Sequence, residues 1–186
     1  MSEHTIALHA ASLADTHAIA VAVAELSRPG DIIVLSGEMG AGKTAFAQAF
    51  GAAIGVTDRI TSPTYTLVHS YPVDSGPRAG KLTLHHADLY RLERTAEVAD
   101  LALRELAEFG GIVLVEWGDV VDVFGDHLVI HLAAPVVEPV AAELEFDGDD
   151  DVLSLDGTRE IDVGVVGGGW AGRWQRLLDG VGDYRC

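Results

Sequence analysis

One short stretch of this chain, SGEMGAGKT at residues 36–44, holds the residue types best suited to chemistry. Its residues match the phosphate-binding pattern G-x-x-x-x-G-K-[ST], with Gly37, Gly42, Lys43 and Thr44 at the four defined positions. Glycines let successive backbone N–H groups turn toward phosphate oxygens, because no Cβ stands in the way. The lysine can reach the β- and γ-phosphates of a nucleotide, and the threonine hydroxyl can ligate Mg²⁺. The pattern therefore predicts a nucleotide phosphate site with a magnesium ion beside it.

A site of this kind also needs a carboxylate for its metal, at the end of a neighbouring buried strand. Glu116 follows four apolar residues in IVLVE and is the favoured metal carboxylate, acting directly or through water. Asp88 ends the more polar run LHHAD and would position the attacking water or complete the metal shell. For each of them the simpler alternative is a carboxylate that caps a helix or forms a salt bridge.

The residues that would recognise the nucleotide base and the γ-phosphate are less clearly marked in the sequence than the phosphate loop. The chain contains no asparagine, so the N-K-x-D signature that reads guanine is impossible, and ATP is the expected ligand. The segment TSPTY, residues 61–65, carries hydroxyl side chains around a proline that fixes the loop. It could sense the γ-phosphate as a switch does, or it could be an ordinary turn that starts a strand.

Histidines and one tryptophan complete the candidate set. His69, His85 and His86 lack the cysteine co-ligands of a metal site, and the adjacent pair points to opposite sides of a strand. We therefore expect these histidines to pack or to form hydrogen bonds. Trp117 directly follows the metal candidate, and it could be a core residue or a lid over the nucleotide.

These side chains need a scaffold of helices and strands to bring them together. The apolar pattern predicts helices at residues 12–27, 43–55 and 94–109, and a short amphipathic helix within 167–180 that Trp170 and Trp174 anchor. Strands are expected at residues 5–10, 32–36, 64–71, 82–88, 111–117, 127–134, 141–146 and 160–166. Helices alternate with buried strands through residue 117, and strands follow strands afterwards. This order indicates an α/β core whose sheet gains antiparallel strands late.

Two details of this scaffold are specific enough to check. The apolar side of the 94–109 helix is expected to consist of Val98, Leu101, Leu103, Leu106 and Phe109. We also expect a P-loop ATPase domain at residues 1–147 and a C-terminal extension at 148–186, packed on the same domain. The acidic run at residues 147–151 is most simply a solvated turn.

Composition excludes several classes of protein. The 186 residues carry a net charge of −17 with only two lysines, whereas autonomous nucleic-acid binding needs clustered positive charge. A basic protein partner, or solubility alone, explains the acidity better. The single cysteine, Cys186, permits no internal disulfide, and no apolar run approaches the ~20 residues of a membrane span. The N-terminus shows no export signal, so we expect a cytoplasmic protein without a membrane partner.

Four motifs together resemble one family. GEMGAGKT, SPTY, HADLYRL and VEW, in this order and spacing, are similar to the TsaE (formerly YjeE) family of bacterial ATPases over roughly residues 12–132. The resemblance implies a P-loop NTPase domain of the α/β class, with a mixed, partly antiparallel sheet and flanking helices. It implies weak ATP hydrolysis that supports threonylcarbamoyladenosine formation at position 37 of tRNA, in a complex with TsaB and TsaD. The tRNA would be reached only through that complex, where TsaD holds the transferase site.

The resemblance also implies roles for individual residues. Nucleotide contacts would come from four parts of the chain. These are Thr16 in the element ADT, Ser62 and Thr64 in the switch-like loop, Trp117, and the phosphate loop with Gly37, Glu38, Gly40, Ala41, Gly42, Lys43, Thr44 and Ala45. Magnesium would be held by Thr44 and Glu116, and the catalytic set would be Lys43, Asp88 and Glu116.

Arginines set this chain apart from the family pattern. Many members have an arginine in the late strands near the nucleotide, whereas PVVEPVAAELEF at residues 135–146 offers none. Arg91 and Arg94 are the nearest candidates for stabilising the transferred phosphate, so hydrolysis by the protein alone is expected to be slow.

Two other functions are compatible with the phosphate loop. A small-molecule kinase would need an arginine-rich lid, for which Arg91, Arg94 and Arg104 form the closest grouping. The other is a nucleotide-gated binding module that hardly hydrolyses ATP at all.

Overall fold

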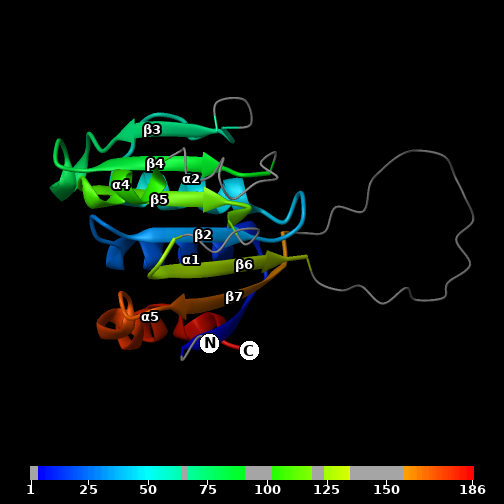
Figure 1. Cartoon of the computed structure of the whole chain (residues 1–186). Coiled ribbons are helices and arrows are strands. Elements are labelled where there is room, and N and C mark those ends of the chain that lie inside the picture. The colour runs from blue at the N-terminus through cyan, green and yellow to red at the C-terminus, as the bar shows by residue number, and fades with distance from the viewer. Residues whose placement is uncertain (1–3, 64–66, 91–101, 119–123, 135–156) are drawn as a thin grey trace, which may run out of the picture.

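The computed structural model describes residues 4–63, 67–90, 102–118, 124–134 and 157–186. Within them, seven strands form one sheet in the order β1-β7-β6-β2-β5-β4-β3, stacked in this order in Figure 1. The strands are β1 Thr5–Ala10, β2 Ile32–Ser36, β3 Val68–Pro72, β4 Thr83–Asp88, β5 Gly111–Glu116, β6 His127–Ala133 and β7 Arg159–Val166. The α-helices are α1 Leu13–Leu26, α2 Lys43–Ile54, α4 Leu103–Glu108 and α5 Trp174–Gly180. Short 3₁₀ helices occupy Gly76–Arg78, Ala171–Arg173 and Gly182–Tyr184.

The centre of the sheet is parallel and its flanks are antiparallel. β2 pairs in parallel with β5 and β6, and β5 pairs in parallel with β4. β3 runs antiparallel to β4, while β7 lies antiparallel between β6 and β1. The mixed α/β sheet predicted from the sequence is confirmed. Because the carboxyl ends of four parallel strands meet at one edge, side chains at those ends are brought close together.

Helices cover both faces of the sheet, which explains the unbroken apolar runs in β2 and β5. Every residue of these two strands is buried. Along β2, Ile33 and Leu35 pack in a cluster with α1, α2 and α5, whereas Ile32 and Val34 pack in a second cluster with α4. A strand buried on both faces needs apolar residues at every position rather than at every second one.

Local signals set the ends of the first two helices as expected. Ser12 is the N-cap of α1, and its side chain accepts a hydrogen bond from the backbone N–H of Asp15. Gly55 ends α2 at a φ of 106°, in the left-handed region that glycine adopts without strain.

The predicted first or last residues of one strand and one helix in the middle of the chain were wrong. The strand expected at 64–71 begins only at Val68, because Leu67 has a φ of 62°, and it continues to Pro72. Of the helix expected at 94–109, the structure shows α4, Leu103–Glu108. Ala102 precedes α4 with a non-helical φ of 50°. Residues 91–101 lie outside the described residues. Phe109 is not on a buried side: it follows the last turn and is 90% exposed.

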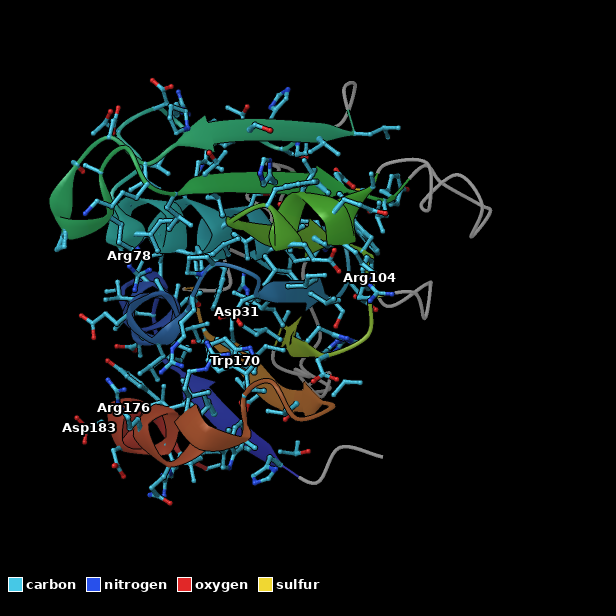
Figure 2. The ribbon with its side chains drawn as sticks, turned by 60° about the vertical axis from the view of Figure 1, so that its left-hand side comes forward. Asp31, Arg78, Arg104, Trp170, Arg176 and Asp183 are labelled. Carbon is cyan, nitrogen blue, oxygen red and sulfur yellow. The ribbon has the colours of Figure 1, made fainter. Side chains whose placement is uncertain are left out.

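The C-terminal segment joins the sheet through β7, and its helix α5 then packs against α1. Trp170 and Trp174 are buried, which confirms their predicted anchoring role. Arg173 forms a buried ion pair with Asp31, the residue before β2, and its guanidinium lies 4.1 Å from the centre of the Trp170 ring. Figure 2 shows Asp31 and Trp170 close together near the middle of the molecule. The strand expected at 141–146 and the acidic turn at 147–151 lie outside the described residues.

A second tie joins the β3–β4 connection to the end of α1. Arg78, labelled beside that helix in Figure 2, donates hydrogen bonds to the carbonyl oxygens of Ala24 and Glu25. Among the described residues, none of the helices has the length and apolar character needed to cross a membrane.

Candidate functional site

The glycine-rich loop connects the carboxyl end of β2 to the N-terminus of α2. Two of its glycines are required by geometry. Gly37 has a φ of 128°, and a Cβ there would come within 2.0 Å of the carbonyl oxygen of Leu132. Gly42 has a φ of 107° and is the N-cap of α2. The loop therefore delivers the backbone of residues 37–44 to the positive end of a helix, an arrangement that binds anions.

Lys43 is buried within this loop rather than extended into solvent. Its Nζ donates to the carbonyl oxygen of Gly37 at 2.7 Å and to that of Glu38 at 2.8 Å. The same Nζ lies 3.8 Å from the centre of the Trp117 ring. The ammonium group is thus held between the loop and an aromatic face, at the entrance to α2.

Thr44 and Glu116, the predicted metal pair, are in direct contact. The Thr44 hydroxyl lies 3.0 Å from Oε1 and 3.3 Å from Oε2 of Glu116, whose side chain is buried. Thr44 lies in the first turn of α2, and Glu116 ends β5, next to β2 in the sheet. Parallel pairing of β2 with β5 brings them together across 72 residues of sequence.

Asp88 ends β4 and lies beside Glu116 in the sheet register. Its Oδ2 accepts a hydrogen bond from the Ser62 hydroxyl at 3.0 Å, and its Oδ1 accepts one from the backbone N–H of Tyr90 at 2.9 Å. The carboxylate is therefore held by one residue of the predicted switch-like loop and by the chain that follows β4.

These residues surround one pocket of about 340 Å³. Its lining consists of Met39, Gly40, Gly42, Lys43, Thr44, Ala45, Ser62, Asp88, Tyr90, Glu116 and Trp117. Trp117 is half-buried, and its φ of 61° turns the chain directly after Glu116. The ring therefore lines the pocket beside Lys43 instead of belonging fully to the core. Met39 and Tyr90 are exposed at its mouth.

Four of the predicted nucleotide residues do not line this pocket. Gly37, Glu38 and Ala41 shape the loop through backbone contacts, including a hydrogen bond from the N–H of Ala41 to the carbonyl oxygen of Glu38. Thr16 is buried on α1, where its hydroxyl donates to the carbonyl oxygen of Ser12. Its nucleotide role stays a prediction from the resemblance. Thr64 lies outside the described residues, as do Arg91 and Arg94.

The three histidines form hydrogen bonds, as predicted. His69 Nδ1 lies 3.3 Å from the Tyr71 hydroxyl, and His85 Nδ1 lies 2.8 Å from the Ser70 hydroxyl. Burial lowers the pKa of His85. His86 Nε2 lies 2.9 Å from Oε1 of Glu116, so this histidine touches the candidate site.

Arg159 is the residue that sequence reasoning missed. The late arginine of the family pattern was sought only at residues 135–146, which offer none, but Arg159, the first residue of β7, reaches the phosphate loop. Its Nε donates to the carbonyl oxygen of Ala41 at 2.8 Å, and one Nη contacts that of Gly40 at 3.4 Å. The signal was weak because β7 follows the loop by more than a hundred residues, and only the sheet order brings it near.

The loop between β2 and α2, the buried lysine and the Thr44–Glu116 contact, set in a mixed α/β sheet, define a P-loop NTPase domain. The chain belongs to the TsaE family: the family described as "Threonylcarbamoyl adenosine biosynthesis protein TsaE" matches residues 10–138. This confirms the family predicted from the four motifs.

Individual relatives agree with this assignment. The chain is 39% identical over 108 residues to the tRNA threonylcarbamoyladenosine biosynthesis protein TsaE of Bacillus subtilis, covering 58% of this chain and 63% of the relative. It is 36% identical to the protein of the same description from Treponema pallidum, covering 58% of this chain and 75% of the relative. The crystal structure of Bacillus subtilis YdiB superposes with a TM-score of 0.66 at 26% identity, over 98% of this chain and 97% of that one. The first of these matches thus spans less than two thirds of the relative's length.

Proposed function

We propose that this protein binds ATP with Mg²⁺ in the pocket at the carboxyl ends of β2, β4 and β5, and hydrolyses it slowly. We further propose that this ATPase supports the formation of threonylcarbamoyladenosine in tRNA, in the cytoplasm. The observation that carries the proposal is the contact between Thr44 and Glu116 next to Lys43, in a chain of the TsaE family.

The phosphates lie against the loop in this proposal. Backbone N–H groups of residues 40–45 face them at the N-terminus of α2, and Lys43 supplies positive charge. To reach the γ-phosphate, the lysine exchanges its bonds to the carbonyl oxygens of Gly37 and Glu38 for bonds to phosphate. Trp117 keeps the ammonium group close to the loop through its aromatic face.

The Thr44–Glu116 pair fits a magnesium ion. It offers one hydroxyl and two carboxylate oxygens within 3.3 Å of one another, and Mg²⁺ prefers oxygen ligands and few protein groups. When bound, the ion neutralises charge on the phosphate oxygens. Thr44 and Glu116 hold it, directly or through water.

Asp88 orients the attacking water. Its two oxygens are held by Ser62 and by the backbone of Tyr90, which aims the carboxylate at the pocket it lines. No arginine lines this pocket within the described parts of the chain. We therefore expect hydrolysis by the protein alone to be slow, because among the described residues no arginine is placed to stabilise transition-state charge, a role that accelerates related enzymes by about 10³–10⁵-fold.

TsaB- and TsaD-like proteins are the partners that we propose for this ATPase. The net charge of −17 disfavours direct binding to tRNA, because tRNA phosphates would repel it. An accessory protein that docks on another protein can be acidic without this difficulty. The tRNA is reached only through the complex.

The small-molecule kinase alternative gains no support from the geometry. Of the three arginines considered for its lid, Arg104 lines a different pocket with Gly30 and Ile32, at the amino end of β2. The other two lie outside the described residues.

Equilibrium binding of a fluorescent ATP analogue in the presence of Mg²⁺ tests the proposal. Lys43→Ala is expected to weaken binding by about a hundredfold, since a charged hydrogen-bond partner of phosphate is lost. Lys81, the only other lysine of the chain, is exposed and does not line this pocket, so Lys81→Ala is the matched control. Equal binding by the two variants would refute the site.

Recovery of partners tests the pathway. Pull-down of the protein from its source cell with ATP, compared with the same experiment without ATP, should recover TsaB- and TsaD-like proteins. Their absence under both conditions would contradict the proposed role in tRNA modification.

A further inference from the structure

His86 is a buried histidine whose side chain forms one hydrogen bond among the described residues, to the carboxylate proposed to bind magnesium. We propose that His86 is a positioning residue: its Nε2–H holds Oε1 of Glu116, and so fixes the carboxylate in the orientation that takes up Mg²⁺ beside Thr44. This inference rests on the proposed function, since it concerns how the same site holds its metal.

The sheet register puts the two side chains on the same face. Asp88 pairs with Glu116 and His86 pairs with Leu114, in adjacent parallel strands. Side chains two residues apart on a strand point to the same side. His86 and Glu116 are therefore diagonal neighbours, and the imidazole ring spans the offset to reach Oε1 at 2.9 Å.

The carboxylate is held from two sides. Thr44 contacts it from α2, and His86 contacts it from β4. Both short contacts are made to Oε1, at 3.0 Å and 2.9 Å, while Oε2 has the longer contact of 3.3 Å. Because His86 is fully buried, no water reaches Glu116 from the side of the ring. The histidine supplies there a hydrogen bond that a buried carboxylate requires.

The other ring nitrogen shows that packing alone does not account for a histidine here. A carboxylate oxygen needs a donor, so the proton is assigned to Nε2. Nδ1 is buried and, within the described residues, has no hydrogen-bond partner. An aliphatic side chain would fill the same space without leaving a polar atom unsatisfied. The advantage of histidine at this position is therefore its bond to Glu116.

Three substitutions separate positioning from packing. His86→Leu removes the donor. His86→Gln keeps it, because the amide nitrogen of glutamine lies the same number of bonds from Cβ as Nε2 of histidine. His86→Asn carries the same amide on a shorter side chain, which cannot reach Oε1 without a shift.

The readout is binding of a fluorescent ATP analogue, measured in EDTA and then at increasing Mg²⁺. For His86→Leu and His86→Asn we expect unchanged binding in EDTA, and a Mg²⁺ requirement raised about tenfold, the usual effect of removing a partner of a metal ligand. His86→Gln should stay within about twofold of the unmodified protein. Thermal unfolding in EDTA without nucleotide reports separately on the fold, and if His86→Leu does not fold, the Gln–Asn comparison decides.

Two outcomes would overturn the inference. One is an unchanged Mg²⁺ requirement in His86→Leu or His86→Asn. The other is a loss of binding that is equal in EDTA and in Mg²⁺, which would indicate a packing role only. Failure of the proposed function looks different: the unmodified protein itself would then show no ATP binding or no response to Mg²⁺, and the inference would fall with it.

Discussion

The two edges of the parallel sheet both contain buried charged groups, but they use them differently. At the amino edge, the Arg173 guanidinium binds Asp31 and the carbonyl oxygens of Leu26 and Gly169, so its donors are used within the fold. At the carboxyl edge, Lys43 and Glu116 line an open pocket. Breaking a charge pair that is enclosed within the fold destabilises the fold, whereas a charge on a pocket wall is available to a ligand. Substitutions at the two edges should therefore affect different measurements.

The largest effect is expected at the amino edge, on stability. Arg173→Leu leaves the Asp31 carboxylate buried without its partner, a loss of about 3–5 kcal/mol, or about 10 °C in melting temperature. Thermal unfolding measures the change. Arg176→Leu, at the exposed arginine labelled in Figure 2, is the control and should change the melting temperature little. ATP affinity should be unaffected while Arg173→Leu is folded, and a large change in affinity would break the distinction between the two edges.

At the carboxyl edge, Glu116→Gln should affect catalysis rather than stability. The substitution preserves size but removes the negative charge that holds Mg²⁺, so ATP hydrolysis should fall by about a hundredfold. Phosphate release measures hydrolysis, and binding of the ATP analogue in EDTA should be retained. Normal turnover would exclude Glu116 as the metal carboxylate.

Arg159 lies between these two cases, because it belongs to the C-terminal segment but bonds to the phosphate loop. Arg159→Gln removes the guanidinium that holds the carbonyl oxygens of Ala41 and Gly40, and should weaken ATP binding about fivefold, the value of one hydrogen bond. Isothermal calorimetry can resolve this difference. Arg176→Gln is the matched control, and equal affinities of the two variants would show that the loop does not need this support.

The smallest effect is expected from pH at His85. Its pKa is lowered by burial, so the folded state favours the neutral ring. The corresponding stability is complete above the unfolded pKa of about 6.5 and is lost as the pH falls through the lower pKa of the folded state. Between pH 7.5 and 5.5, the melting temperature of the unmodified protein should fall further than that of His85→Gln. Parallel pH curves for the two proteins would contradict this assignment.

Local patterns were sufficient for the phosphate loop. The spacing from Gly37 to Thr44, the apolar runs of β2 and β5, and Gly55 at the end of α2 each depend on residues close in sequence. They were predicted correctly for that reason. The same local rules failed at Leu67 and Ala102, because a positive φ at a residue other than glycine leaves no trace in hydrophobic periodicity.

The sequence by itself determined the P-loop and the family, because a motif of backbone turns and side chains acts through neighbours along the chain. The choice of ATP over GTP stays a prediction. Only the tertiary structure decided that Glu116 meets Thr44, that His86 meets Glu116 and that Arg159 supports the loop. These contacts join residues 72, 30 and 118 positions apart. Strand order sets such contacts, and strand order follows from burying all the apolar faces together rather than from any one segment.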